Sequence, residues 1–156
     1  MKRRTVVMMA TIALTWSVFA NENSDELRLT PAEIQTLPAM SGGAGTSGLQ
    51  GIRTTVIAGD PTANGPYTIA LQVPANTRIA AHRHRDARTA VVIAGLWNFG
   101  FGKVANDSAT KALPPGSVYT EPAGVMHFAR TGAEGATVYI FGVGPTDTVY
   151  GAEVSP

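Results

Sequence analysis

Short apolar runs separated by glycine- and proline-containing turns dominate the sequence after residue 50. In the clearest run, residues 67–73 (YTIALQV), an apolar side chain stands at every second position. Because successive side chains of a strand point to opposite faces, this alternation predicts a half-buried β-strand. Similar runs recur every 8 to 12 residues or so, which is typical of a sandwich or barrel. We therefore predict an all-β domain of about eight to ten short strands, with a bulge or hairpin around Gly95 in the run 89–102.

The first 20 residues have a different composition. They begin with Met-Lys-Arg-Arg, continue without a charge and end in Val18-Phe19-Ala20. This is typical of a secretory signal peptide, since a membrane-spanning helix needs about 20 apolar residues and this run has about 16. We predict that residues 1–20 are removed during export through the general secretory route to the periplasm or the extracellular space, which leaves no membrane segment.

Residues 21–50 are predicted to form an N-terminal extension. Thr30-Pro31-Ala32-Glu33 fits a capping box with proline at the first helical position, which predicts a short helix through about Leu37. Residues 41–48 (SGGAGTSG) have the composition of a flexible linker. The remaining residues, 51–156, then form a single domain of ordinary size.

The composition excludes several kinds of site. The chain has no cysteine, so it has no disulfide, and a metal site must use histidine, carboxylate or amide side chains. Three of the 12 basic residues lie in residues 1–20, so nine basic and 11 acidic residues remain after cleavage. This balance gives no reason to expect a nucleic-acid partner.

The chain has only three histidines. His82 and His84 lie in AAHRHRDART (residues 80–89), where strand geometry places their side chains on the same face. His127 follows a Pro-x-Gly turn in a second strand-like run. Neutral imidazole is a common ligand for divalent transition metals, so the three side chains together predict a metal site. The alternative is that the His82–His84 pair is an ordinary solvated feature of a basic surface strand.

The spacing of these residues resembles the two motifs of the cupins. The first motif is glycine, five residues, His-x-His, three or four residues, glutamate, six residues and glycine; the second is glycine, five residues, Pro-x-Gly, two residues, histidine, three residues and asparagine. The matching positions in this chain are Asn76, His82, His84, Arg88 and Gly95, then Gly116, Pro122, Gly124, His127 and Thr131. The resemblance covers about residues 50–145. It implies a double-stranded β-helix, or jelly-roll barrel, which the short helix predicted from the capping box would precede.

Three positions depart from the cupin pattern. Asn76 replaces a turn glycine, and asparagine tolerates positive φ better than most residues. Thr131 replaces asparagine. Arg88 stands where the family has a glutamate ligand, and a cation cannot bind a cation. The metal is then held by three histidines and water, or by a further carboxylate, for which Asp86 and Glu121 are the candidates.

The resemblance implies a function based on one divalent metal ion, for which zinc, iron, manganese, nickel and copper remain open. Three neutral imidazoles leave such a site with a net charge of about +2, which favours a small anionic or chelating ligand. Other three-histidine cupins include dioxygenases, which suggests a dioxygenase-like enzyme; the alternative is a non-catalytic cupin that binds or senses a small ligand. Tyr119, Glu121 and Arg88 are the candidate catalytic residues.

The remaining predictions concern the pocket and the assembly. The candidate pocket walls, each of which is otherwise a core residue, are Phe99, Phe101, Tyr119, Met126, Phe128 and Tyr139. Trp97 is a candidate for the mouth of the pocket or, equally, for a core or dimer contact. Many cupins pair as homodimers, and the apolar segment 51–59 is our candidate for the edge strand in such a dimer.

Overall fold

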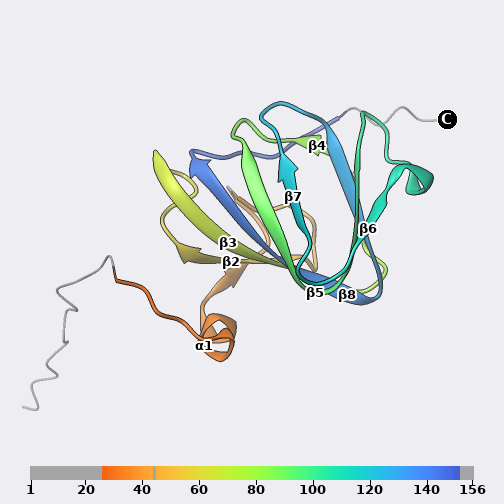
Figure 1. Cartoon of the computed structure of the whole chain (residues 1–156). Coiled ribbons are helices and arrows are strands. Elements are labelled where there is room, and N and C mark those ends of the chain that lie inside the picture. Colours follow the sequence, from red (N-terminus) through yellow and green to blue (C-terminus); the bar gives the residue numbers. More distant parts are fainter. Residues whose placement is uncertain (1–25, 44, 152–156) are drawn as a thin grey trace, which may run out of the picture.

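A curled β-sheet forms most of the protein in the computed structural model, which describes residues 26–43 and 45–151 (Figure 1). The predicted signal peptide, residues 1–20, lies outside the described residues. The elements are α1 (Pro31–Thr36), β1 (Ala39–Met40), β2 (Arg53–Ala58), β3 (Gly65–Val73), β4 (Arg78–Arg83), β5 (Arg88–Phe101), the 3-10 helix η1 (Asp107–Ala109), β6 (Lys111–Leu113), β7 (Val118–Glu121), β8 (His127–Gly144) and β9 (Val149–Tyr150). The predicted all-β class is confirmed, and none of the described helices is long and apolar enough to cross a membrane.

The short N-terminal helix forms as predicted. The hydroxyl of Thr30 accepts a hydrogen bond from the backbone N–H of Glu33, and the Glu33 carboxylate accepts one from the backbone N–H of Thr30. This reciprocal pair satisfies N–H groups that a helix start otherwise leaves without partners. The helix ends at Thr36, and Leu37 is its C-cap.

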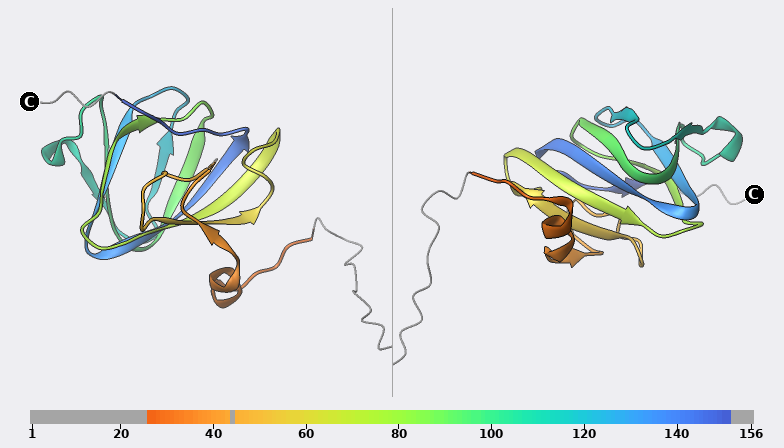
Figure 2. Two further views of the ribbon diagram at one scale, coloured as in Figure 1. Left: turned by 180° about the vertical axis from the view of Figure 1, so that it is seen from behind. Right: turned by 60° about the horizontal axis from the view of Figure 1, so that its bottom comes forward.

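Two long strands, β5 and β8, form the frame of the barrel. The strand order β1-β2-β3-β8-β4-β9 runs along one path, while β5 pairs with β6, β7 and β8. β8 pairs with β4 near its start and with β3 near its end, so it bends from one side of the barrel to the other (Figures 1 and 2). The β5–β8 register shifts on either side of Gly95, which has a φ of 74°, so the predicted bulge is present.

The apolar faces of these strands form the core. The alternating residues of β3 are all buried, from Tyr67 to Val73, as the sequence pattern predicts. They pack with inward side chains of β5 and β8, including Val92 and Val138. β2, within the predicted dimer segment, pairs with β3 on one side and with the two-residue β1 on the other. The homodimer itself stays a prediction.

Two of the departures from the cupin pattern have clear structural roles. Asn76 has a φ of 53°, the only positive value among the described non-glycine residues, so it adopts the backbone conformation expected of the turn glycine that it replaces. The Thr131 hydroxyl donates to the backbone oxygen of Pro74 (2.6 Å) and accepts from the backbone N–H of Thr77 (2.9 Å). Thr131 therefore fixes the β3–β4 turn to β8.

The predicted flexible linker, residues 41–48, differs from its expectation at Thr46 and Ser47. Both are buried, and they accept hydrogen bonds through their backbone oxygens from the hydroxyls of Thr148 (2.8 Å) and Tyr150 (2.6 Å). This part of the chain thus lies against residues 148–150. Its small residues allow a close approach between the two segments, although their composition had indicated a flexible linker. Its position matters because Thr46, Ser47 and Thr148 line the cavity described next.

Candidate metal centre

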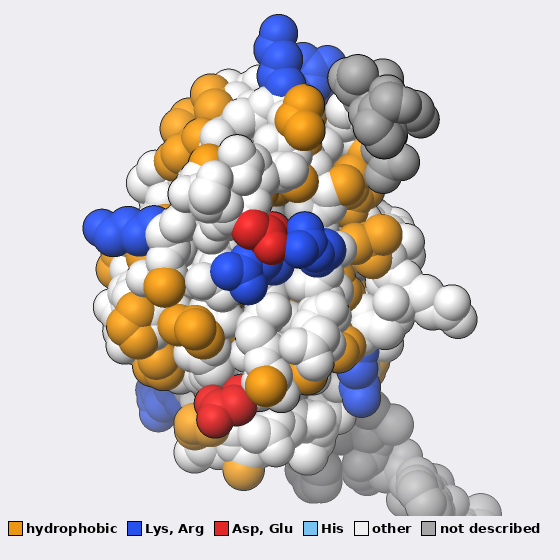
Figure 3. Space-filling model, turned by 90° about the vertical axis from the view of Figure 1, so that its right-hand side faces the viewer, with side chains coloured by type: hydrophobic (Ala, Val, Ile, Leu, Met, Phe, Trp, Pro, Cys, Tyr) orange, Lys and Arg blue, Asp and Glu red, His pale blue; other side chains and the backbone are white. Residues whose placement is uncertain are grey.

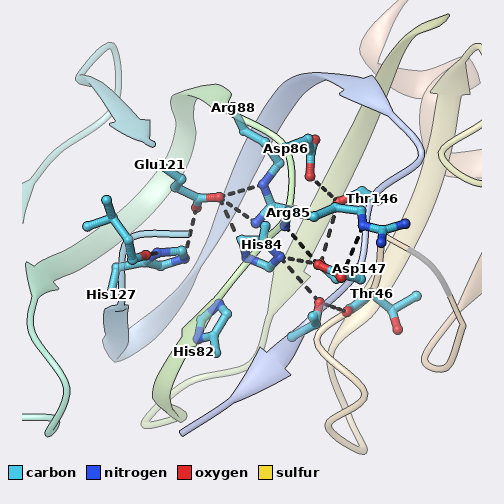
Figure 4. Close-up of polar contacts among 12 residues, drawn as sticks. Thr46, His82, His84, Arg85, Asp86, Arg88, Glu121, His127, Thr146 and Asp147 are labelled. Carbon is cyan, nitrogen blue, oxygen red and sulfur yellow. Dashed lines mark hydrogen bonds and ion pairs between the residues drawn. The ribbon is translucent and has the colours of Figure 1, made fainter. Parts of the chain in front are cut away.

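The three histidines meet inside the barrel. His82 lies on β4 directly opposite His127, the first residue of β8, and His84 follows the end of β4. Their side chains offer ligand atoms that all lie within 4.8 Å of one another. The residues are 7%, 3% and 1% exposed for His82, His84 and His127, and no histidine surface is visible on the face shown in Figure 3. Figure 4 shows the imidazoles gathered below Glu121 and Arg88.

Backbone contacts determine which nitrogen of each imidazole carries the proton. Each Nδ1 lies against a backbone oxygen: His82 against Ala80 (2.8 Å), His84 against Asp147 (2.5 Å) and His127 against Val125 (3.0 Å). A carbonyl oxygen can only accept a hydrogen bond, so Nδ1 must be the donor. The neutral rings therefore present the lone pair of Nε2, which is the arrangement of a histidine ligand oriented by its surroundings.

The histidines are held in their neutral form. Burial, opposed only in part by Glu121, lowers the pKa of His82 to about 4 and that of His84 to about 3, and burial also lowers the pKa of His127. Nε2 of His84 and Nε2 of His127 are buried without a hydrogen-bond partner among the described residues. Such unpartnered lone pairs are costly, and a cation would satisfy them. The donor set therefore fits a divalent transition metal.

Arg88 and Glu121 form a buried ion pair beside the histidines. They stand opposite each other on β5 and β7, and they are 5% and 4% exposed. Nε of Arg88 donates to Oε2 of Glu121 at 2.6 Å, and its Nη2 contacts the same oxygen. Burial alone would raise the pKa of Glu121, but Arg88 and the nearby histidines outweigh it and lower that pKa below its usual value. Arg88 points inward as a neutralised cation, so its charge is not free to attract a ligand.

Glu121 also faces the histidines. Its Oε2 lies 3.8 Å from Nε2 of His84, and its Oε1 lies 3.8 Å from Nε2 of His127. These distances are too long for hydrogen bonds, but they place the carboxylate next to two of the three candidate ligand atoms. Of the candidate fourth ligands, Glu121 therefore adjoins the histidine cluster.

Asp86 has a different setting. Its Oδ2 accepts a hydrogen bond from the Tyr67 hydroxyl at 2.6 Å, and its Oδ1 accepts one from the Thr146 hydroxyl at 2.5 Å. Burial and the bond to Asp86 raise the pKa of Tyr67 to about 12. Both oxygens are thus engaged in joining β3 to the segment before β9, and Figure 4 shows Asp86 turned toward Thr146. Because β4 ends at Arg83, strand parity no longer determines where Asp86 points.

A small cavity of about 30 Å³ adjoins the cluster. It has room for about two water molecules. Its polar lining includes the three histidines, Arg88 and Glu121, and its apolar lining includes Trp97 and Phe99. Of the predicted wall residues, only Phe99 and Trp97 line this cavity, and Trp97 is too deeply buried to lie at a mouth.

The other predicted wall residues lie elsewhere. Phe101 is half exposed, and Phe128 is buried but outside the lining of this cavity; Met126 and Tyr139 are partly buried and also lie outside that lining. Tyr119 packs its ring on Phe99, with centroids 4.3 Å apart. Burial and the charge of Glu121 raise the pKa of Tyr119 well above its usual range, and its hydroxyl has no hydrogen-bond partner among the described residues. No sequence pattern indicated that Thr46, Ser47 and Thr148 would line the cavity, because only the fold brings their segments to it.

Comparison with known proteins gives matches in structure alone. The sequence matches no protein-family model and no curated protein. The polyketide cyclase RemF from Streptomyces resistomycificus has a TM-score of 0.59 and 17% identity, over 81% of this chain and 89% of that one. An RmlC-like cupin from Shewanella frigidimarina has a TM-score of 0.53 and 14% identity, over 70% and 86%.

A structure from the study of the DMSP lyases RdDddP and RnDddQII has a TM-score of 0.60 and 15% identity, over 74% of this chain and 63% of that one. Identities this low indicate a shared architecture and do not transfer an activity. Together with the curled sheet and the three convergent histidines, they show that this chain has the cupin fold.

Proposed function

We propose that the protein is a metal-binding cupin in which His82, His84 and His127 hold one divalent transition metal through their Nε2 atoms. One observation carries the proposal: three neutral imidazoles converge in a buried cluster, each oriented by a backbone oxygen on Nδ1. The ions that remain open are zinc, iron, manganese, nickel and copper, all of which bind imidazole. The solvated-surface alternative finds no support, because all three histidines are buried.

The charge of the site favours a small anionic or chelating partner. Three neutral imidazoles add no charge to a divalent cation, and the charges of Arg88 and Glu121 offset each other. The centre would then keep a net charge of about +2 in a low-dielectric setting, which attracts anions. The cavity has a volume of about 30 Å³. Unless Thr46 and Ser47 move, it can hold only a ligand of a few atoms.

We further propose that the protein is an enzyme of dioxygenase type. When bound, the metal would supply a Lewis acid with open coordination positions for a ligand. The chain itself excludes bulk water with Trp97 and Phe99 and holds a carboxylate, Glu121, beside the cluster. The structural comparisons are compatible with a catalytic function, since a polyketide cyclase and a structure from the study of two DMSP lyases share the architecture.

A non-catalytic cupin that binds or senses a small ligand is the second candidate. The small cavity favours it, because Thr46 and Ser47, held by hydrogen bonds from Thr148 and Tyr150, leave little room for a reacting substrate. Oxygen uptake by metal-loaded protein in the presence of small carboxylates, thiols and diketones separates the two. Turnover of any of them supports the enzyme, and binding without turnover supports the binding protein.

Metal content tests the proposal directly. Purified protein should carry about one equivalent of a divalent transition metal, and His84→Ala should lose it while the barrel stays folded. Arg83→Ala is the matched control, since Arg83 is the exposed residue between the two histidines and should keep its metal. A folded wild-type protein that binds no metal, or a His84→Ala variant that retains it fully, would refute the ligand assignment.

The cellular setting remains our proposal from the sequence. Residues 1–20 would direct export to the periplasm or the extracellular space, and the mature chain would form a homodimer. N-terminal sequencing of the exported protein should begin at Asn21, and sedimentation should give twice the chain mass. A retained N-terminus would contradict the first expectation, and a concentration-independent monomer the second.

A further inference from the structure

Arg88 and Glu121 face each other on the neighbouring strands β5 and β7. Arg88 stands at the position where the motif resembled by this chain carries its glutamate ligand. Its direct partner across the β5–β7 pairing is Glu121, whose side chain is equally buried. A carboxylate is therefore still present beside the histidines, but it comes from the opposite strand.

The two oxygens of Glu121 have unequal surroundings. Both contacts from Arg88 go to Oε2, which leaves Oε1 directed at Nε2 of His127, 3.8 Å away. Figure 4 shows the carboxylate between the guanidinium and the imidazoles. The arrangement is that of a carboxylate oriented by a hydrogen-bonding partner on one oxygen while the other oxygen remains available to a metal.

The distances permit coordination. Ligand atoms about 2.1 Å from a common ion, at tetrahedral or octahedral angles, lie roughly 3.0 to 3.4 Å from one another. Oε1 of Glu121 lies 3.8 Å from Nε2 of His127, which exceeds this range by a few tenths of an ångström, whereas the 3.8 Å contact to Nε2 of His84 is made by Oε2. Coordination through Oε1 therefore requires the carboxylate to rotate toward the histidine ligand atoms, which lie within 4.8 Å of one another. The alternative carboxylate, Asp86, has both oxygens engaged by Tyr67 and Thr146.

We propose that Glu121 is the fourth protein ligand of the metal, bound through Oε1, and that Arg88 positions it by holding Oε2. The inference rests on the proposed function and deepens it. It also changes the charge of the site: the ligand carboxylate reduces the metal centre to about +1, and Arg88 supplies the remaining positive charge on the far side of the carboxylate. An anionic ligand then reaches the metal from the cavity, which Arg88 also lines.

Cobalt(II) titration of the metal-free protein tests the inference through binding and absorption, without any need for activity. Glu121→Gln keeps the size of the side chain but removes the anionic ligand, so we expect Co²⁺ affinity to fall by about 100-fold and the visible absorption bands to change. Glu121→Gln also leaves Arg88 buried without its partner, which destabilises the fold. The double variant Arg88→Met, Glu121→Gln removes both charges and should show the same loss of affinity and the same altered spectrum.

Two further variants separate coordination from general structure. Asp86→Asn is the matched control at the other carboxylate and should bind Co²⁺ with the wild-type spectrum and nearly the wild-type affinity. Arg88→Met keeps the ligand but not its positioning, so its affinity should fall by about tenfold while the bands of the carboxylate-bound ion remain. A structural role for Arg88 alone would not preserve the spectrum while lowering the affinity.

The outcomes distinguish the inference from the proposal on which it rests. Wild-type affinity and spectrum in the double variant, with binding abolished in His84→Ala, would overturn the role of Glu121 and leave the three-histidine site intact. Wild-type protein that is folded and binds no Co²⁺ would overturn both. A changed spectrum in Asp86→Asn, with none in the double variant, would assign the fourth ligand to Asp86.

Discussion

Acidification should destabilise the metal-free protein well before its carboxylates are protonated. His82 and His84 have pKa values of about 4 and about 3 in the folded protein, against the ordinary value of 6.5 that we take for the unfolded chain. Between these limits the unfolded chain binds protons that the folded chain does not, so stability must fall as the pH is lowered through 6.5. The stability that these histidines contribute is present in full only above their unfolded pKa.

The magnitude follows from the shifts. Lowering the pH from 7 to 5 protonates each of these side chains in the unfolded state only. For each pH unit below 6.5, this protonation stabilises the unfolded state by about 1.4 kcal/mol per histidine. Each histidine then costs about 2 kcal/mol, and the two together about 4 kcal/mol, which is a large part of the 5 to 15 kcal/mol typical of a domain. His127 acts in the same direction, since burial lowers its pKa also.

Urea unfolding of metal-free protein at pH 7 and pH 5 measures this loss. With an m-value of about 1.5 kcal/mol/M, the midpoint should fall by roughly 2 to 3 M. Glu121 does not interfere, because its pKa is lowered from 4.5 and its stabilisation is lost only at more acidic pH. In the matched control, His82→Gln, His84→Gln, most of the difference should disappear. A midpoint that is equal or higher at pH 5 in the wild-type protein would refute the reasoning.

Three further predictions concern the framework of the site. Gly95→Ala should destabilise the fold by about 3 kcal/mol in urea unfolding, because Gly95 has positive φ and a Cβ there meets backbone of β8; a change below 0.5 kcal/mol would contradict it. Tyr150→Phe should cost about 1 kcal/mol and speed amide exchange around Ser47, whose backbone oxygen loses its 2.6 Å hydrogen bond; unchanged exchange would show that the bond does not hold this segment. Arg88→Met alone should cost 3 to 5 kcal/mol or so in the metal-free protein, because Glu121 keeps a buried charge, whereas the double variant with Glu121→Gln should cost far less; equal losses would argue against the ion pair.

The sequence allowed the histidine cluster to be predicted because two kinds of information coincide there. Strand parity places His82 and His84 on one face over a span of three residues, where little can intervene. The third histidine follows a turn whose glycine, Gly124, needs the positive φ that it adopts. The alternation of β3 likewise predicts its buried face, because the barrel keeps one side of that strand against the core.

Cross-strand pairing was beyond such reasoning. Nothing local to Arg88 or Glu121 indicates that they stand opposite each other, since the β5–β7 register is fixed by the intervening β6 hairpin and by core packing. Parity also failed at Asp86, where the chain turns after β4 and the carboxylate reaches Tyr67 instead. Thr46 shows a third limit: a run of small residues indicates flexibility and close packing equally well, and only the partner segment decides between them.

The ion pair gives a physical reason why arginine is tolerated at a position where the resembled motif has a ligand. A buried arginine is costly unless a carboxylate partners it, and a buried carboxylate near neutral imidazoles is costly unless a cation partners it. Arg88 and Glu121 meet both requirements at once, so either residue alone would be less stable than the pair. Because both Arg88 contacts go to Oε2 and Oε1 faces His127, Arg88 and a metal can each contact a different oxygen of the one carboxylate. Substitution at position 88 is thus expected to be tolerated only together with a change at position 121.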